Sequence, residues 1–471
     1  MRLRPALVAA TLVLAACAPV GPDYQRPSYD LPQAYPGSPS TAEAALPTDW
    51  WTLYGDAKLD ELVAAALARN SDIRLAVARI EEADANLREA NAAFLPEIDL
   101  NAVPARSRIS STQATPLPAT IPAVRNNVRL TATTSFELDF WGKLRRGVEA
   151  VRAQALATRY AKDVVALSLA GLTAQAYFSL RSLDAQIAAT RQTLASRDEA
   201  LTYVRNRARG GVASDLDVSQ AETARADSAV QLRDLLRQRA LAEHQLGTLT
   251  GRPDLTDPGG VELLALPVPP VPPAGLPSAL IERRPDIRQA EQALVSANAQ
   301  IGVAKAAMLP AISLTGVDGW ESKALSSLIQ GTSAIWSLGF ALTLPIFDWG
   351  RFEARTDAAI AREHQALAGY QKSIETGFRE VADALTNAQQ TTEAEADYVT
   401  RLEAARRTLR LAKLRYESGY SAYLEVLDAQ RTANDAELAF VRNRQSRLSA
   451  SVDLMKALGG GWAPEMAGNY P

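Results

Sequence analysis

The chain has 471 residues, of which 47% are hydrophobic, so it can bury a large core and is not a disordered polymer. Its formal net charge of −3 gives no electrostatic case for binding nucleic acid. There are two histidines in unrelated places, so we expect no histidine-based metal site, no bound metal and no cofactor.

The first 16 residues have the pattern of an export signal. Arg2 and Arg4 precede the apolar run Ala6–Ala16, which is too short to span a bilayer. Cys17, the single cysteine, follows Leu14-Ala-Ala and resembles the cysteine of a bacterial lipobox, whose thiol receives a diacylglycerol. We therefore predict a lipoprotein signal peptide over residues 1–16 and lipid attachment at Cys17. The alternative is an ordinary secretory signal that contains a chance cysteine.

Residues 17–57 are predicted to form a lipidated, extended N-terminal segment. Pro, Tyr, Ser and Gly are frequent between Pro19 and Pro47 and follow no period. Trp50 and Trp51 then mark the entry to packed structure. Beyond the export signal we expect no apolar run of about 18 residues, and so no transmembrane helix.

A first repeat is predicted over residues 58–251. Its opening helix, Lys58–Phe94, has one interruption at Asn70 and ends at Leu95-Pro96, because the residue before a proline avoids helical backbone angles. A strand pair follows at about 97–140, where Val128–Phe140 alternates apolar and polar residues. The rest is a long helix at 143–208, a tip at 209–214 and a return helix at 215–250. The long helix carries apolar residues seven apart, the spacing of a coiled-coil seam: Leu180, Ile187, Leu194 and Leu201.

A second repeat of the same order is predicted over residues 278–459, after a stiff, proline-rich linker at 252–277. It has an opening helix, a strand pair at about 311–347, a long helix at 351–416, a tip at 417–421 and a return helix at 422–458. Residues 460–471 form a C-terminal tail. Matching positions support the duplication: Leu309-Pro310 repeats Leu95-Pro96, Trp349-Gly350 repeats Trp141-Gly142, Asp286-Ile-Arg repeats Asp72-Ile-Arg, and Gly419 repeats Gly211.

Strands with one apolar and one polar face, in an exported chain, favour an outer-membrane barrel. Such a barrel must close, and known barrels begin at about eight strands, so several chains must share one barrel. The long helices carry charges throughout, such as Arg181 and Asp184, and must project into water. The predicted fold class is an α+β membrane duct: a long α-helical coiled-coil barrel plus a transmembrane β-barrel shared between protomers, with four strands per chain and an internal duplication. The alternative is a periplasmic helical scaffold lipoprotein with a small sheet.

The chain resembles the outer membrane factor family, the TolC-like exit ducts of tripartite efflux systems, and most of all its lipoprotein branch that serves RND-type pumps. The resemblance covers nearly the whole mature chain and is carried by Leu14-Ala-Ala-Cys17, Gly21-Pro-Asp-Tyr24, Trp50-Trp51, Asn70-Ser-Asp72, Arg283-Arg-Pro-Asp286, Phe347-Asp-Trp-Gly350 and Tyr416–Gln430.

The resemblance implies a homotrimer in the bacterial outer membrane, lipid-anchored at Cys17, with its helices projecting into the periplasm. It implies two partners, a periplasmic adaptor (membrane fusion) protein and an inner-membrane RND-type transporter, and no catalysis. The duct would passively carry drugs and other toxic small molecules outward. A type I protein secretion duct has the same architecture and is the alternative.

The resemblance also implies a gate at the periplasmic tips. Glu425 and Asp428 match acidic positions of a constricted, cation-attracting ring, and Asp217 matches Glu425 in the first half. The alternative reading is two solvated acids on a helix surface. Tyr416 matches a tyrosine that helps lock the mouth, but Ser421 stands where a basic partner has precedent, so the lock rests on Tyr420, Tyr423 or other contacts.

The hairpin tips are the predicted contact with the adaptor. We expect Gly211 and Gly419 to end their helices in left-handed backbone geometry, and Ser421 to cap the helix that follows. By resemblance, the residues that meet the adaptor are Gly210, Gly211, Val212, Gly419 and Tyr420.

Overall fold

The computed structural model describes residues 19–30, 32, 34, 35, 46–110, 112, 114, 118, 120, 122–272 and 280–462. The predicted signal peptide and Cys17 lie outside these residues. The chain divides into two compact units, each drawn from both halves of the sequence. The sheet unit comprises Met1–Pro27, Ile80–Ala157 and Ala290–Tyr370, and the helical unit comprises Ser28–Arg79, Thr158–Gln289 and Gln371–Pro471.

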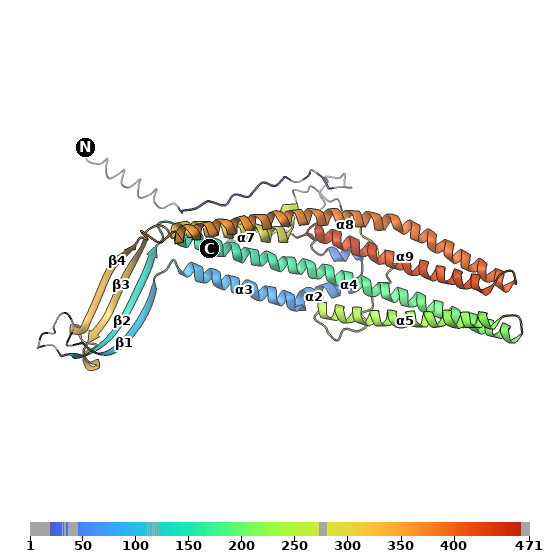
Figure 1. The fold of residues 1–471 in the computed structure, drawn as a ribbon, viewed down its shortest axis with the longest axis horizontal. Coiled ribbons are helices and arrows are strands. Elements are labelled where there is room, and N and C mark those ends of the chain that lie inside the picture. The colour runs from blue at the N-terminus through green and yellow to red at the C-terminus, as the bar shows by residue number, and fades with distance from the viewer. Residues whose placement is uncertain are drawn as a thin grey trace. The chain divides into compact units, whose positions relative to one another are not determined.

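The sheet unit holds one antiparallel sheet of four strands in the order β1-β2-β3-β4 (Figure 1). The strands are β1 (Glu97–Arg108), β2 (Val124–Leu138), β3 (Ala311–Ser322) and β4 (Ala334–Thr343). The β2–β3 pair joins the two halves of the sequence, with Leu138 opposite Ile312. Strands β1 and β4 therefore form the two open edges of the sheet.

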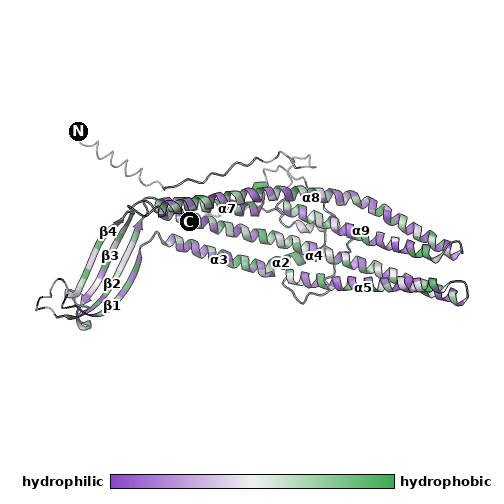
Figure 2. Cartoon of the chain, viewed as in Figure 1, coloured by the Kyte–Doolittle hydropathy of each residue, from purple (hydrophilic) through white to green (hydrophobic). Residues whose placement is uncertain are grey.

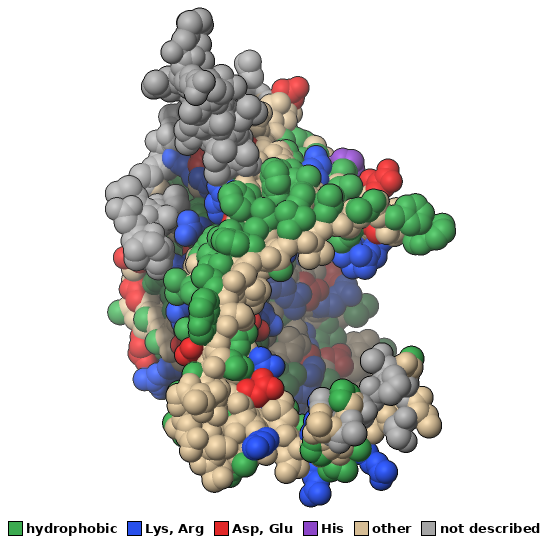
Figure 3. Space-filling view, turned by 90° about the vertical axis from the view of Figure 1, so that its left-hand side faces the viewer, with side chains coloured by type: hydrophobic (Ala, Val, Ile, Leu, Met, Phe, Trp, Pro, Cys, Tyr) green, Lys and Arg blue, Asp and Glu red, His purple; other side chains and the backbone are tan. Residues whose placement is uncertain are grey.

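The predicted alternation puts an apolar row on one face of the sheet. Leu100 lies opposite Ala132, and Phe136 opposite Leu314, which in turn lies opposite Phe340. Many of these side chains are exposed in the single chain, and Figure 3 shows hydrophobic side chains gathered in a band on this part of the surface. The most exposed on β4 and β1 are Trp336, Leu338, Phe340, Leu342, Ile98 and Leu100.

The fourth strand is shorter than predicted, because it ends at Thr343 rather than at about Phe347. Pro345 lacks a backbone N–H and cannot continue the ladder. Leu344, Ile346 and Phe347 nevertheless stay exposed and extend the apolar surface beyond the strand.

The helices follow the duplicated pattern. The first half has α2 (Ala57–Arg69) after the short 3₁₀ helix η1 (Trp50–Tyr54), then α3 (Ser71–Ala92), α4 (Lys143–Arg209) and α5 (Asp215–Leu249). The second half has α6 (Leu280–Arg283), α7 (Pro285–Ala306), η3 (Leu325–Ser327), η4 (Gly331–Ser333), α8 (Arg351–Glu417) and α9 (Tyr423–Ala457). The two long helices have 67 residues each and the two return helices 35 each, so the main helices of the two halves match in order and length. Asn70 ends α2 and its side chain accepts from the backbone N–H of Asp72, which accounts for the predicted interruption.

The core of the helical unit gathers around η1. Trp50 and Tyr54 are fully buried and pack against Phe178 and other apolar residues of α4, α5 and α9. The predicted seam on α4 is also inside: Leu180, Ile187 and Leu201 are buried, and Leu194 is half-buried.

The expectation that no further apolar run of about 18 residues exists was wrong. An 18-residue window of α4 has a mean hydropathy of 1.3, which would allow a membrane span by length and composition alone. Half of that window is buried inside the protein. Figure 2 shows apolar and polar residues interspersed along the long helices, as expected of helices that pack against neighbours and face water.

Candidate functional site

The two hairpin tips end their long helices in the same way. Gly211 and Gly419 have left-handed backbones, with φ of 73° and 81°. The following residues reach back over the turn: the N–H of Val212 donates to the carbonyl of Arg207 at 2.9 Å, and that of Tyr420 to the carbonyl of Arg415 at 2.8 Å. This is the hydrogen-bond pattern of a Schellman motif, and it confirms the glycine stops predicted for both hairpins.

The two tips pack against each other through one buried cluster, which we call the tip cluster. It takes residues from all four helices, so it connects the α4–α5 hairpin to the α8–α9 hairpin. Its buried members are Leu201, Val204, Ala221, Ala412, Tyr416, Tyr423, Val426 and Ala429.

Tyr416 is the centre of the tip cluster. Its ring centroid lies 5.3 Å from that of Tyr423 and 6.3 Å from that of Tyr203 on α4. The guanidinium of Arg207 lies 5.0 Å from the Tyr416 ring centroid and 5.7 Å from that of Tyr203, and it donates to the Tyr203 hydroxyl at 3.3 Å. A cation over an aromatic face is attracted to the ring. Arg207 of the first hairpin is therefore a basic neighbour of the Tyr416 ring, which belongs to the second hairpin.

The hydroxyl of Tyr416 is buried and has no hydrogen-bond partner among the described residues. Burial raises the pKa of this hydroxyl, and the charge of Arg207 opposes the shift. The ring of Tyr416, rather than its hydroxyl, therefore makes the contacts between the hairpins. Tyr423 and Tyr420 are the other two tyrosines expected to hold the tips together. Tyr423 lies in the tip cluster, whereas Tyr420 is 81% exposed.

Both predicted gate acids of α9 are exposed and already have an arginine nearby. Arg415 lies 3.4 Å from Glu425, and Arg431 lies 2.7 Å from Asp428. Each acid therefore shares its surroundings with a positive charge. A ring built from these residues would be less negative than the carboxylates alone suggest.

Asp217 and Ser421 lie near the starts of the two return helices, α5 and α9. Asp217 forms a capping box with Ser214 at the start of α5, since each side chain pairs with the other's backbone N–H. The predicted cap by Ser421 was wrong: the residue at the start of α9 is Ala422, and no side chain caps this helix. A cap must directly precede the first helical residue, and Ser421 lies one position too early.

The base of the α9 tip contains polar atoms without partners. Gln430 is 5% exposed, and neither its amide nitrogen nor its amide oxygen has a partner among the described residues. The hydroxyl of Ser421 is in the same situation. Buried polar groups without partners cost free energy, so this packing of the tips is weaker than its apolar contacts alone would make it.

The outermost residues of the tips are exposed. Val212 is 66% and Tyr420 81% exposed, and Gly210, Gly211 and Gly419 are exposed as well. Two equivalent leucines, Leu216 and Leu424, add to this surface at 65% and 60%. Each hairpin thus presents a small apolar end to solvent.

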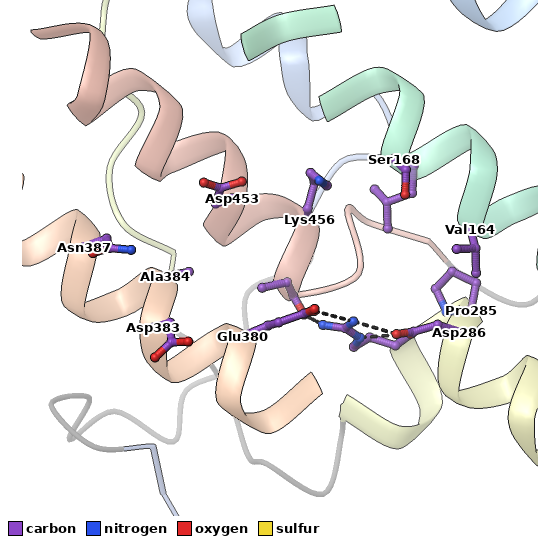
Figure 4. Close-up of a pocket in the computed structure, with 13 residues that line it drawn as sticks. Val164, Ser168, Pro285, Asp286, Glu380, Asp383, Ala384, Asn387, Asp453 and Lys456 are labelled. Carbon is purple, nitrogen blue, oxygen red and sulfur yellow. Dashed lines mark hydrogen bonds and ion pairs between the residues drawn. The ribbon is translucent and has the colours of Figure 1, made fainter. Parts of the chain in front are cut away.

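A second site in the helical unit surrounds Arg284. This side chain is 7% exposed and makes two hydrogen bonds to Asp286, at 2.9 and 2.6 Å. It also bonds Glu380 on α8 at 2.6 Å and the carbonyl of Ala457 at the end of α9 at 3.1 Å. A cavity of about 430 Å³ lies beside this network, and Figure 4 shows Asp383, Asp453 and Lys456 around it.

The sequence pointed to Tyr416, Glu425 and Asp428 but not to the side chains that surround them. Tyr203 and Arg207 lie four apart on α4, so they share a helix face, and this spacing is the signal that could have identified them. Arg415 and Arg431 were in view within the second tip, but their pairing with the acids depends on how α8 and α9 pack.

Comparison with known proteins agrees with this geometry. Residues 62–252 and 276–460 match the family described as outer membrane efflux protein. The chain is 38% identical over 468 residues to the outer membrane protein OprJ of Pseudomonas aeruginosa, covering 96% of this chain and 94% of OprJ. It is 34% identical over 475 residues to the toluene efflux pump outer membrane protein TtgF of Pseudomonas putida, covering 97% of this chain and 96% of TtgF.

The fold resembles that of a solved channel, and the names of TtgF and CmeC describe an efflux pump protein and a channel, not enzymes. The CmeC outer membrane channel of Campylobacter jejuni aligns with a TM-score of 0.89 at 25% identity, over 95% of this chain and 96% of CmeC. Both halves of the chain thus match one family in sequence, and 95% of the chain matches a solved outer membrane channel in fold. The chain belongs to the outer membrane efflux protein family.

Proposed function

We propose that this chain is the outer-membrane exit duct of a tripartite efflux pump, conducting small molecules that an inner-membrane RND-type transporter delivers through a periplasmic adaptor protein. The observation that carries the proposal is the sheet: one face is apolar and exposed, and both edges are open. A face of this kind suits lipid, and open edges in lipid must be paired. TtgF is named for toluene efflux, which supports small organic molecules as cargo.

We propose that three copies share one barrel. Four strands per chain, with β1 and β4 at the edges, leave each copy in need of neighbours on both sides. Three copies would supply twelve strands, an even number in the range of known outer-membrane barrels.

We propose that the packed tips are the shut state of a gate formed by Tyr416, Glu425, Asp428 and Asp217. The tip cluster supports this role, because it joins the two hairpins through a small buried contact that holds unpaired polar atoms. Such a contact can separate without unfolding the long helices behind it. The exposed ends, at Gly210, Gly211, Val212, Gly419 and Tyr420, are then free to receive the adaptor.

The double change Glu425→Ala with Asp428→Ala tests the gate. We expect it to raise the conductance of the channel in lipid bilayers and to lower its preference for cations, because two carboxylates per copy are removed while Arg415 and Arg431 stay. Glu437→Ala is the matched control, since Glu437 is also an arginine-paired acid on α9 but lies farther along the helix from the tip than Glu425 and Asp428. An unchanged conductance and an unchanged cation preference would count against the gate.

We propose that Cys17 carries the lipid anchor, which the Leu14-Ala-Ala-Cys17 sequence supports. An acylated cysteine would hold the chain at the membrane surface through about 0.8 kcal/mol per buried CH₂. The intact mass of the purified protein should include an acyl mass that Cys17→Ser removes. A wild-type mass equal to that of the unmodified polypeptide would refute the anchor.

A further inference from the structure

Two equivalent tryptophans of the sheet unit have different surroundings. Trp141-Gly142 follows β2 and Trp349-Gly350 follows β4, and the two glycines have nearly the same φ, 76° and 78°. Each pair leads directly into a 67-residue helix. The two turns therefore occupy the same place in the two halves of the chain.

The first tryptophan is bonded to the neighbouring strand. The indole Nε1–H of Trp141 donates to the carbonyl of Pro310 at 2.8 Å. Pro310 immediately precedes β3, and β3 is the strand that pairs with β2. Thus the residue after one strand is bonded to the residue before the next strand of the sheet.

The second tryptophan has no such acceptor in the part of its own chain that the structure describes. Trp349 is 88% exposed, and among the described residues its ring contacts Phe347, at 4.6 Å between centroids, with no hydrogen bond to the indole. Gly350 faces open space. The strand before Trp349, β4, lies at an edge of the sheet, so the strand whose preceding residue would serve as acceptor is missing.

The backbone at Trp349 is also unusual. Its φ is 59°, a left-handed conformation that is costly for a bulky side chain. Asp348 holds it, because its carboxylate accepts from the N–H groups of Gly350 at 3.1 Å and Phe352 at 2.8 Å. In the first half the helix is capped by Asp139, one position earlier relative to the tryptophan, and Trp141 is not in this conformation. Backbone strain of this kind is typical of functional positions. At Trp349 the strained backbone carries a side chain that is exposed in the single chain.

The residue equivalent to Pro310 in the first half is Pro96, and it lies at the other edge of the sheet. Pro96 immediately precedes β1 as Pro310 precedes β3, and β1 is an open edge. We propose that the indole of Trp349 donates to the carbonyl of Pro96 in the neighbouring copy of this chain, and that this bond fixes the register between β4 and the neighbour's β1. The proposal rests on the shared barrel proposed above, and it specifies the contact that closes that barrel.

The β2–β3 pairing then predicts the register between copies. Leu138, three residues before Trp141, lies opposite Ile312, two residues after Pro310. The equivalent pair across the interface is Ile346 with Ile98. Ile346 and Leu344 lie just beyond the end of β4, and Leu344 comes opposite Leu100. Within the strands, the same register places Leu342 opposite Ala102 and Phe340 opposite Pro104.

This register agrees with the faces of the sheet. Each of these residues belongs to the apolar row, and a slip by one residue would place Leu342 and Leu344 opposite the polar side chains of Asn101 and Asp99. The tryptophan and proline positions alone determine this register, and the facing apolar residues agree with it. The duplicated pattern therefore gives the interface the same alternation of faces as the β2–β3 pair.

Disulfide cross-linking tests the register. The proposed register puts Thr343 opposite Asn101 of the neighbouring copy, within the Cα separation that a disulfide needs. We expect Thr343→Cys with Asn101→Cys to give covalently linked trimers on oxidation, and Thr343→Cys with Asp99→Cys or with Val103→Cys to give none. Each single-cysteine variant controls for Cys17. Cross-linking by a shifted pair would overturn the register and leave the shared barrel standing. A protein that stays monomeric in every variant would overturn the barrel itself.

Loss of the indole N–H tests the bond. We expect Trp349→Phe to speed the dissociation of subunits in detergent about tenfold, which corresponds to about one net hydrogen bond per interface. The matched control is Trp336→Phe, because Trp336 is an equally exposed tryptophan on β4 (80%) whose first-half equivalent, Val128, has no indole to donate. If Trp349 were instead an aromatic anchor in the lipid interface, the two variants would behave alike and Trp349→Tyr would be neutral. That result would overturn the bond.

Discussion

Tyr416→Ala is expected to open the tips of the duct, whereas Tyr416→Phe is expected to leave them shut. Truncating a buried aromatic side chain costs about 3 kcal/mol or more of packing. If the packed tips are the shut state, that loss shifts the balance toward the open state by about 100-fold. The ring of Tyr416 contacts Tyr203, Arg207 and Tyr423, and phenylalanine keeps all three contacts.

The phenylalanine variant distinguishes ring packing from a hydrogen-bonded lock. The hydroxyl of Tyr416 has no partner among the described residues, so its removal deletes a buried, unpaired polar group and costs nothing. Single-channel conductance in bilayers is the measurement, and Tyr420→Ala is the control, because Tyr420 is at the same tip but is 81% exposed. If Tyr416→Phe conducted as strongly as Tyr416→Ala, the hydroxyl rather than the ring would hold the tips together.

Much of the architecture could be predicted because it is encoded in local periodicity. Alternation over β2 identified a two-faced strand, the heptad leucines of α4 identified a buried seam, and Gly211 and Gly419 marked the turns. These signals act over a few residues and do not depend on which elements meet. The duplication supported the assignment of the remaining elements, since an element found in one half predicted its equivalent in the other.

The contacts at the tips could not be predicted, because they depend on how helices far apart in sequence pack together. Nothing local shows that Arg207 of α4 covers the ring of Tyr416 on α8, or that Arg415 pairs with Glu425 across the turn. The cap at α9 failed for a different reason. The helix begins one residue later than the serine allows, and helix ends are the least certain part of any sequence-based assignment.

Arg284→Ala is expected to lower the free energy of unfolding of the helical unit by about 3 kcal/mol. Removing one partner of a buried ion pair is strongly destabilising, because it leaves charges without compensation. The value lies at the low end of the usual range, since the side chains of Asp286 and Glu380 stay 31% and 43% exposed and can be partly hydrated. The thermal loss of helical circular dichroism in detergent measures the effect.

Two further variants isolate what Arg284 does. Arg284→Lys keeps the charge but loses the planar fork that bonds Asp286 twice, so we expect an intermediate loss. Arg379→Ala removes an exposed arginine from the same helix as Glu380, where the pair with Asp383 is worth at most about 1 kcal/mol. Equal melting of Arg284→Ala and Arg379→Ala would show that the buried network adds nothing beyond a surface pair.

The effect is large because Arg284 bonds groups on three helices at once: α7, α8 and α9. Asp286 lies in the first turn of α7, where a negative charge suits the helix dipole, and Arg284 holds it there. The carbonyl of Ala457 is at the last residue of α9 and has no partner within its own helix, so Arg284 closes that helix end as well. Glu380 lies on α8 and also accepts from Arg284, so Arg284 links the start of α7 and the end of α9 to α8. Losing one side chain thus leaves a helix start, a helix end and a long helix without their common contact.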